Sequence, residues 1–338
     1  GRPGACPHIK MHAGVQAVAS AARAKAEQAR ALVRGLQAEL QQAKEERQEL
    51  HAQLVQAGEQ RDAALEGRVW AQLDEAREYA RDAARRIAEK TAEVDAQGKQ
   101  LAGLWEWTRL TGLSDPMPRL GYITANALMI AALAWAAGPN LFALKAAALL
   151  GVAWWVLALA WLWRFEFGQA DRGRFRILKL LAGSLAAVPA WAALVWLHQL
   201  PGHGPRWALF AVMLVWAADT GAYFVGVRMG KHKMAPRISP NKSWEGFWGG
   251  LAGASLIAVF AVKPLGLGWD DLPVLVFLTI VAAMMSVAGD LFESLLKRHS
   301  GHKDSGHLIP GHGGMLDRLD SLLAALPVFM VGKLWLGL

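Results

Sequence analysis

Seven apolar segments in the last two thirds of the chain constrain its fold more than any other feature. Each is about 17–23 residues long, and about 20 apolar helical residues are needed to cross the hydrocarbon core of a bilayer. The segments therefore predict an all-α, polytopic transmembrane helical protein with about seven spans. They cover residues 120–137, 141–163, 178–198, 207–226, 246–262, 272–288 and 322–338.

The connections between these segments alternate in their content of Lys and Arg. Basic residues are frequent in 164–179, 228–242 and 297–318, whereas 138–140 has none and 263–271 has one Lys beside two Asp. Positively charged loops remain on the cytoplasmic side of the membrane. The pattern places the basic loops in the cytoplasm and the C-terminus outside, and we expect an integral protein of the bacterial inner (plasma) membrane.

Net charge and cysteine content exclude two broad classes of protein. The formal net charge is +8, and the excess of Lys and Arg falls in the apolar part of the chain. Basic residues that flank apolar segments indicate membrane lipids or phosphate-bearing substrates as partners, rather than nucleic acid. Cys6 is the single cysteine, which excludes an intrachain disulfide framework.

The first hundred residues have the opposite composition. Residues 15–104 are rich in Ala, Gln, Glu, Arg and Leu, contain no Pro, and hold only one of the 16 tryptophans, Trp70. This composition predicts a long hydrophilic helix, and local heptad spacing of Leu and Ala indicates a weak coiled coil. The predicted organisation is a disordered tip (1–14), a hydrophilic helical or coiled-coil extension (15–104) and a transmembrane domain (105–338).

Four aspartates lie at the boundaries of the predicted spans, where an ionised carboxylate is costly unless it faces a cation or water. Asp219 lies inside the fourth segment, with a turn-capping role as the structural alternative, and Asp290 lies just beyond the sixth. Asp317 and Asp320 are three residues apart, so both can face one ion. Oxygen ligands without a nearby Cys favour Mg²⁺, although the loop histidines leave Zn²⁺ open. We therefore predict these four acids as metal ligands.

The loops beside these acids carry basic residues and glycines. Lys and Arg side chains can neutralise a polyphosphate, although anchoring at a cytoplasmic membrane surface would also explain them. Glycines let backbone N–H groups approach phosphate oxygens closely, and a loop histidine can donate to phosphate or serve a structural role. The residues concerned are Lys297, Arg298, Lys303, Arg318, Gly311, His312, Gly313 and Gly314.

Two stretches of this polar sequence resemble the motifs of a known family. One reads Ser294-Leu-Leu-Lys297-Arg298 and, after four residues, Lys303-Asp304-Ser305-Gly306-His307-Leu-Ile-Pro310-Gly311-His312-Gly313-Gly314-Met-Leu-Asp317-Arg318-Leu-Asp320. It resembles the long motif of the CDP-diacylglycerol synthase (phosphatidate cytidylyltransferase) family. Asp219-Thr-Gly-Ala-Tyr223 and Ser239-Pro-Asn-Lys242-Ser-Trp-Glu245-Gly246 resemble a second block of that family. The resemblance covers about residues 104–338 and begins near Trp105-Glu106-Trp107.

The resemblance implies a nucleotidyltransferase of phospholipid biosynthesis. It implies that the enzyme condenses phosphatidic acid with CTP to give CDP-diacylglycerol and pyrophosphate, using Mg²⁺ with a second cation, and that it is a homodimer. Family members usually carry apolar spans ahead of the Glu-Trp region, where this chain has the hydrophilic residues 15–104.

The resemblance also assigns roles by position. Asp290 and Asp317 match acids of a metal pair, with Asp219 and Asp320 close by. The implied catalytic residues are Asp290, Asp317, Lys297 and Arg318. The implied substrate- and nucleotide-binding residues are Ser239, Lys242, Arg298, Lys303, Asp304, Gly311, His312, Gly313 and Gly314.

Three other interpretations share part of this pattern. A CTP-dependent lipid-alcohol kinase would use similar phosphate chemistry, but it fits the full motif less well. A membrane-anchored coiled-coil scaffold with an inactive enzyme half would explain residues 15–104, but it has no use for the intact acids and glycines. A transporter with Asp219 as its ion site is the third alternative.

Overall fold

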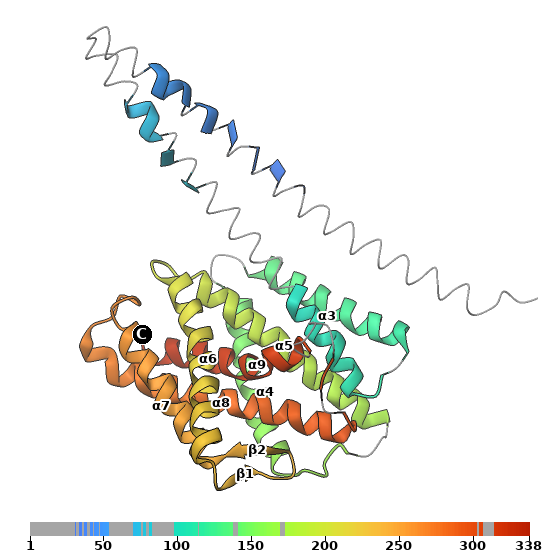
Figure 1. The fold of residues 1–338 in the computed structure, drawn as a ribbon. Helices are drawn as coiled ribbons and strands as arrows, with labels where there is room; N and C mark the ends of the chain where they lie inside the picture. Colours follow the sequence, from blue (N-terminus) through green and yellow to red (C-terminus); the bar gives the residue numbers. More distant parts are fainter. Residues whose placement is uncertain are drawn as a thin grey trace, which may run out of the picture. The chain divides into compact units, whose positions relative to one another are not determined.

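The computed structural model describes residues 98–113, 115–137, 141–169, 173–302, 304–306 and 314–338, and scattered residues between 31 and 82. The chain forms two compact units, Gly1–Lys99 and Gln100–Leu338 (Figure 1). Every described residue of the first unit is helical. Residues 1–14 lie outside the described residues, as do most of residues 15–104, so the disordered tip and the coiled coil remain predictions.

Seven long helices build the described part of the second unit, and they follow the helical residues 100–110. Each apolar segment predicted from the sequence is confirmed as a helix. The bounds are α3 Pro116–Ala136, α4 Phe142–Leu162, α5 Gly173–His198, α6 Gly204–Met229, α7 Trp244–Ala261, α8 Leu272–His299 and α9 Leu316–Trp335.

Five of these helices are long and apolar enough to cross a membrane. They are α3, α4, α5, α6 and α8, the last extended by a short 3₁₀ turn to Trp269–His299. By the same measure α7 and α9 are not candidates: α7 is rich in glycine, and α9 carries Asp317, Arg318, Asp320 and Lys333 within 20 residues. The protein is thus a polytopic integral membrane protein, and the number of seven spans remains a prediction.

An aromatic cluster centred on Phe292 of α8 holds the core together. Trp107 stacks on Phe292 with ring centroids 6.3 Å apart, while Trp154, Trp155 and Trp161 of α4 meet it edge-on at 5.4–5.9 Å. Edge-to-face aromatic contacts of this kind add stability beyond the area they bury. Because Phe292 lies among the acidic residues of α8, the cluster also fixes the side of α8 that carries them.

Helices α6 and α7 pack closely through small residues. A Cβ atom added at Gly250 would lie 2.9 Å from the carbonyl oxygen of Ala218, and one at Gly253 would lie 2.7 Å from that of Ala217. Small residues let helix backbones approach each other where lipid supplies no hydrophobic driving force. This contact brings α7 against the turn of α6 that carries Asp219.

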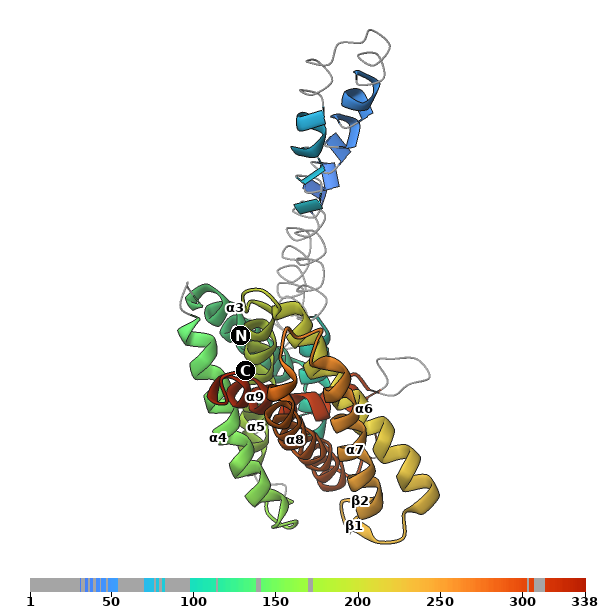
Figure 2. The same cartoon turned by 90° about the vertical axis from the view of Figure 1, so that its left-hand side faces the viewer.

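A two-stranded antiparallel hairpin lies at one end of the helices (Figure 1 and Figure 2). Its strands are β1 Lys233–Ala235 and β2 Ser239–Ser243, with Lys233 paired to Ser243. The sequence predicts an all-α protein with a polar loop here, so this connection departs from the prediction. The hairpin matters for the site because β2 delivers Ser239 and Lys242 to the ends of α6 and α8.

Candidate active site

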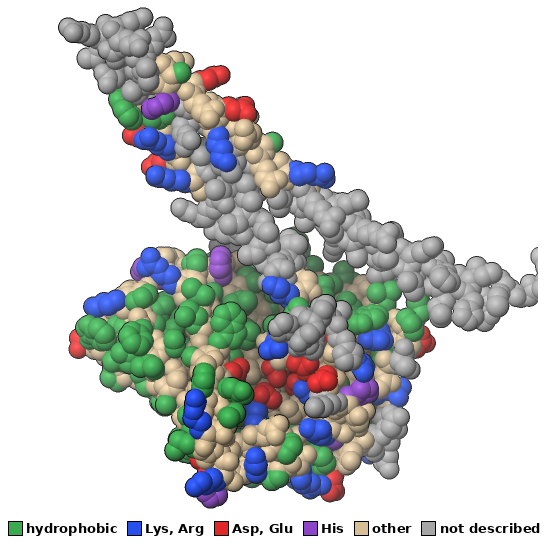
Figure 3. Space-filling view, viewed as in Figure 1, with side chains coloured by type: hydrophobic (Ala, Val, Ile, Leu, Met, Phe, Trp, Pro, Cys, Tyr) green, Lys and Arg blue, Asp and Glu red, His purple; other side chains and the backbone are tan. Residues whose placement is uncertain are grey.

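A pocket of about 350 Å³ opens between α6, α7, α8 and the hairpin. On the face shown in Figure 3, acidic side chains gather in a hollow with Lys and Arg side chains near them. The lining of the pocket combines polar and apolar side chains, so it suits a ligand that has both a charged group and apolar chains. The polar lining includes Asp219, Ser239, Asn241, Lys242 and Asp290, and the apolar lining includes Ala218, Ala222, Phe247, Leu251 and Val287.

Lys242 and Asp290 form an ion pair inside this pocket. The Nζ atom of Lys242 on β2 lies 2.6 Å from Oδ2 of Asp290 on α8, and both side chains are largely buried. The hydroxyl of Ser294 donates to the other carboxylate oxygen of Asp290 at 3.3 Å. Asp219 of α6 lines the same pocket, so three separate elements contribute charged groups to it.

Lys297 lies between two further carboxylates. Its Nζ atom donates to Oε2 of Glu293 at 2.7 Å and to Oδ1 of Asp317 at 3.0 Å. The Glu293 side chain is 1% exposed and that of Lys297 is 14% exposed, so the charges are strongly desolvated. Asp317 also accepts hydrogen bonds from the backbone N–H groups of Ser305 and Gly314.

Asp320 links the two groups of charges. Its carboxylate interacts electrostatically with Asp290 on one side and with Glu293 on the other. The backbone N–H of Ser321 donates to Asp320 Oδ1 at 2.7 Å. Helix α9 therefore places Asp317 and Asp320 on one side, but they have different nearest partners, and Lys297 occupies the space beside Asp317.

The carboxylates of this region fit a hard divalent cation. All the donors are oxygen atoms, which Mg²⁺ prefers and which are poor selectors of Zn²⁺. Glu293 Oε1 is buried and receives no hydrogen bond from another described residue, so this oxygen is able to act as a cation ligand. In the described part of the chain, no three Asp, Glu, His or Cys side chains stand ready around a single metal position. Lys242 and Lys297 take up part of the carboxylate charge instead.

The other proposed site residues have mixed surroundings. Arg298 Nε donates to the carbonyl oxygen of Ile238 at 3.0 Å and so ties α8 to the hairpin turn. The N–H of Gly314 is directed at Asp317, not at an open anion site. Arg318 and Asp304 are exposed. Lys303, Gly311, His312 and Gly313 lie outside the described residues.

Glu245 fixes the start of α7 against the hairpin. His232 Nδ1 donates to Glu245 Oε1 at 2.6 Å, and the backbone N–H groups of Lys231 and His232 donate to the same carboxylate. The hydrogen bond from His232, with the backbone N–H groups, lowers the pKa of Glu245 to about 2. Glu245 therefore remains ionised at neutral pH and holds β1 close to the pocket.

Sequence reasoning did not assign Glu293 or Asn241 to the site. Glu293 could have been found, because it lies three residues after Asp290 and four before Lys297, on one helix face. Asn241 carries no comparable signal, since a single amide in a short polar stretch has many roles. Its position in the pocket wall depends on the hairpin, which the sequence did not predict.

Comparison with known proteins gives a consistent result. Residues 96–334 match the family model described as the cytidylyltransferase family. A phosphatidate cytidylyltransferase of Pseudomonas aeruginosa is 46% identical over 69% of this chain and 83% of its own length. One of Haemophilus influenzae is 38% identical over 68% of this chain and 85% of its own length. One of Staphylococcus epidermidis is 36% identical over 62% of this chain and 78% of its own length.

Proposed function

The chain belongs to the cytidylyltransferase family, and we propose on this premise that it is a membrane-embedded phosphatidate cytidylyltransferase. It condenses CTP with phosphatidic acid to give CDP-diacylglycerol and pyrophosphate. The observation that carries the proposal is a pocket lined by the Lys242–Asp290 ion pair and Asp219 together with apolar side chains. The resemblance found in the sequence is confirmed, and the named relatives favour none of the three alternatives.

The reaction needs charge neutralisation more than covalent chemistry. A phosphate oxygen of phosphatidic acid attacks the α-phosphorus of CTP, a new P–O bond forms, and the bond to the β-phosphate breaks to release pyrophosphate. Because the phosphate monoester already carries its nucleophilic oxygen, the protein has to align the reactants and stabilise charge on the leaving group. Lys242 and Lys297 are placed for this task by β2 and α8.

The carboxylates are proposed to hold Mg²⁺. Asp290, Asp219 and Asp320 would supply its oxygen ligands, with Glu293 and Asp317 beside them, and the unpartnered Glu293 Oε1 supports this assignment. The ion would neutralise the phosphate charge of the bound nucleotide. The second cation and the homodimer rest on the resemblance alone and are part of the proposal.

Lys242 is proposed to change partners during substrate binding. In the structure its ammonium group is 2.6 Å from Asp290. A triphosphate carries more negative charge than one carboxylate and offers several acceptor oxygens, so it competes for the ammonium group. Transfer of Lys242 to phosphate would free Asp290 to bind a cation, which couples nucleotide binding to assembly of the site.

The apolar lining is proposed to receive the lipid substrate. Phe247 and Leu251 of α7 and Val287 of α8 line the same pocket as the charged residues. A substrate with a phosphate head and acyl chains meets both kinds of surface at once. We place the site on the cytoplasmic side of the inner membrane, because CTP is cytosolic and the hairpin lies in a basic connection.

The test is pyrophosphate release by the detergent-solubilised full chain with CTP, phosphatidic acid and Mg²⁺. We expect activity that chelation with EDTA removes and added Mg²⁺ restores. Asp290→Asn and Asp317→Asn should each lose at least about 100-fold in kcat while remaining membrane-inserted. Asp270→Asn, at an exposed aspartate in the 3₁₀ turn that precedes the start of α8, is the matched control and should keep full activity.

The products also separate the alternatives. A lipid-alcohol kinase would release CDP and no pyrophosphate, and a scaffold would release neither. Near-normal turnover in Asp290→Asn would contradict its assignment as a metal ligand, and near-normal turnover in Asp317→Asn would contradict a role for its pair with Lys297 in the reaction.

A further inference from the structure

Glu106 is a buried carboxylate that does not line the pocket. It lies in the helical residues 100–110 and is 3% exposed. A carboxylate at this depth requires hydrogen-bonding partners, since an unpaired buried charge is strongly destabilising. Its partners come from about 200 residues further along the chain: the Ser305 hydroxyl donates to Oε2 at 3.2 Å, and the Leu316 N–H donates at 2.8 Å.

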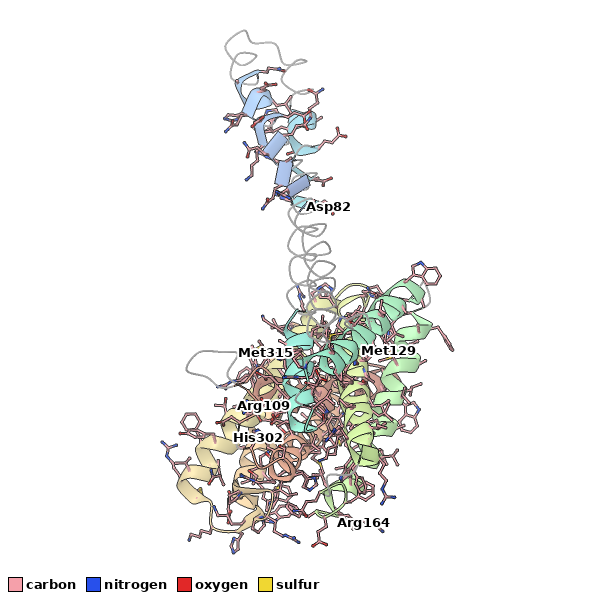
Figure 4. The ribbon with its side chains drawn as sticks, turned by 90° about the vertical axis from the view of Figure 1, so that its right-hand side faces the viewer. Asp82, Arg109, Met129, Arg164, His302 and Met315 are labelled. Carbon is pink, nitrogen blue, oxygen red and sulfur yellow. The ribbon has the colours of Figure 1, made fainter. Side chains whose placement is uncertain are left out.

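The hydrogen bond from the Leu316 N–H makes the Glu106 side chain a cap for the N-terminus of α9. Helix α9 begins at Leu316, and the residue before it, Met315, provides no side-chain cap. The first N–H groups of a helix need acceptors, and a negative charge at that end is favourable. The Glu106 carboxylate provides an acceptor and a negative charge at this helix end. Figure 4 shows Met315, at the start of α9, beside the helix that carries Arg109.

Two glycines leave the space that the Glu106 carboxylate fills. A Cβ atom at Gly306 would overlap Glu106 Oε1, and one at Gly314 would lie 2.5 Å from Oε2 and overlap the Ser305 hydroxyl. Neither glycine has a positive φ angle, so backbone conformation does not require glycine at these positions. The close approach of the carboxylate gives a physical reason for glycine at both.

The contacts of Glu106 lead directly to the charged site. Ser305 and Gly314, which it touches, each donate a backbone N–H to the carboxylate of Asp317. Asp317 in turn accepts from Lys297 at 3.0 Å. Removal of Glu106 would therefore release the groups that orient Asp317, without removing any group that lines the pocket.

We propose that Glu106 is a positioning residue for cytidylyl transfer, which clamps residues 304–306 and 314–316 together and so orients Asp317 beside Lys297. The expected effect of Glu106 on catalysis rests on the proposed function, whereas its contacts with residues 304–306 and 314–316 do not. In this proposal Glu106 contacts neither substrate. It orients Asp317 through the backbone N–H groups of Ser305 and Gly314.

The test compares Glu106→Ala, Glu106→Gln and a control in the full chain. Gln100→Ala is the matched control, because Gln100 is a buried polar residue of the same helical stretch whose Nε2 donates instead to Ala187 O at 2.7 Å. We expect Glu106→Ala to lower kcat by about 10- to 100-fold with KM for CTP nearly unchanged. Glu106→Gln retains an acceptor oxygen and should recover most of kcat, and Gln100→Ala should keep it.

Hydrogen–deuterium exchange gives a readout that does not depend on activity. In Glu106→Ala the amides of Ser305, Gly314 and Leu316 should exchange faster, while peptides from α4 and α5 remain as in the wild type. Unchanged exchange at these three amides would overturn the clamp. Failure of the wild type to release pyrophosphate would refute the proposed function and leave this measurement valid.

A double variant tests the fit of the glycines. Gly306→Ala should impair turnover, because its methyl group needs the space of the Glu106 carboxylate. In the Glu106→Ala background that space is free, so the double variant should be no worse than Glu106→Ala alone. Additive losses would contradict the direct contact. If Glu106→Ala does not fold, turnover and amide exchange are measured in Glu106→Gln and Gly306→Ala instead.

Discussion

Replacement of Lys297 by Met should affect both stability and catalysis. Lys297 is the shared cationic partner of Glu293 and Asp317, and its side chain is 14% exposed. Met has a similar length and no charge, so packing along α8 is retained while the two carboxylates lose their ammonium group. The variant therefore reports on electrostatics rather than on a cavity.

The size of the effect follows from the depth of the site. Removing one member of a buried ion pair costs about 3–5 kcal/mol, because the remaining charge is left desolvated. Glu293 is 1% exposed, which places the pair in this range and not in the range of surface pairs. For a unit of roughly this size, 1 kcal/mol shifts Tm by about 2–4 °C, so Tm should fall by about 6–20 °C.

The assay is thermal unfolding of the detergent-solubilised protein, with pyrophosphate release measured on the same samples. Lys231→Met, at an exposed lysine of the same basic connection as the hairpin, is the matched control and should leave Tm within about 2 °C. A second variant, Lys297→Met with Glu293→Leu, removes both members of the buried Glu293–Lys297 pair. It should regain much of the lost Tm but no activity.

Two results would refute this reasoning. If Lys297→Met unfolds at the wild-type temperature, the carboxylates are not held by Lys297 in the folded protein. If the double variant regains both stability and turnover, Lys297 has no part in the chemistry.

Two other predictions follow from the geometry. Lys242→Ala should raise KM for CTP by about 10- to 100-fold, the value of a charge-assisted hydrogen bond, and unchanged kinetics would rule out phosphate binding by Lys242. Gly253→Ala places a Cβ atom 2.7 Å from the Ala217 carbonyl and should cost about 1–3 kcal/mol, measured as a lower Tm. Gly121→Ala in α3, where a Cβ atom meets nothing within 4 Å, is its control and should not lower Tm.

The helices could be predicted from the sequence because a long apolar run is typical of a membrane-spanning helix. Their ends could not. The sixth segment was expected to end at residue 288, but α8 continues to His299. Hydropathy detects only the apolar part, whereas the helix continues with Asp290, Glu293 and Lys297 along one side. In the same way α9 begins six residues before its predicted segment and includes both of its aspartates.

The site was predictable in its residue types and not in its pairings. Acids and bases near the ends of apolar segments indicated the region in which the structure has its pocket. The pairing of Lys242 with Asp290 depends on the hairpin, and no strand signal is present there because Pro240, Asn241 and Lys242 have low strand propensity. The contact of Glu106 with Leu316 joins residues 210 positions apart, which no local pattern contains.

The balance of charge in the site explains why lysines and acids occur together. Among the described residues, Lys242 pairs with Asp290, and Lys297 pairs with Glu293 and Asp317, while Asp219 and Asp320 interact electrostatically with Asp290. Carboxylates gathered in a partly desolvated space attract divalent cations. The lysines hold the acids in place, and the proposed cation makes the pocket receptive to a polyphosphate.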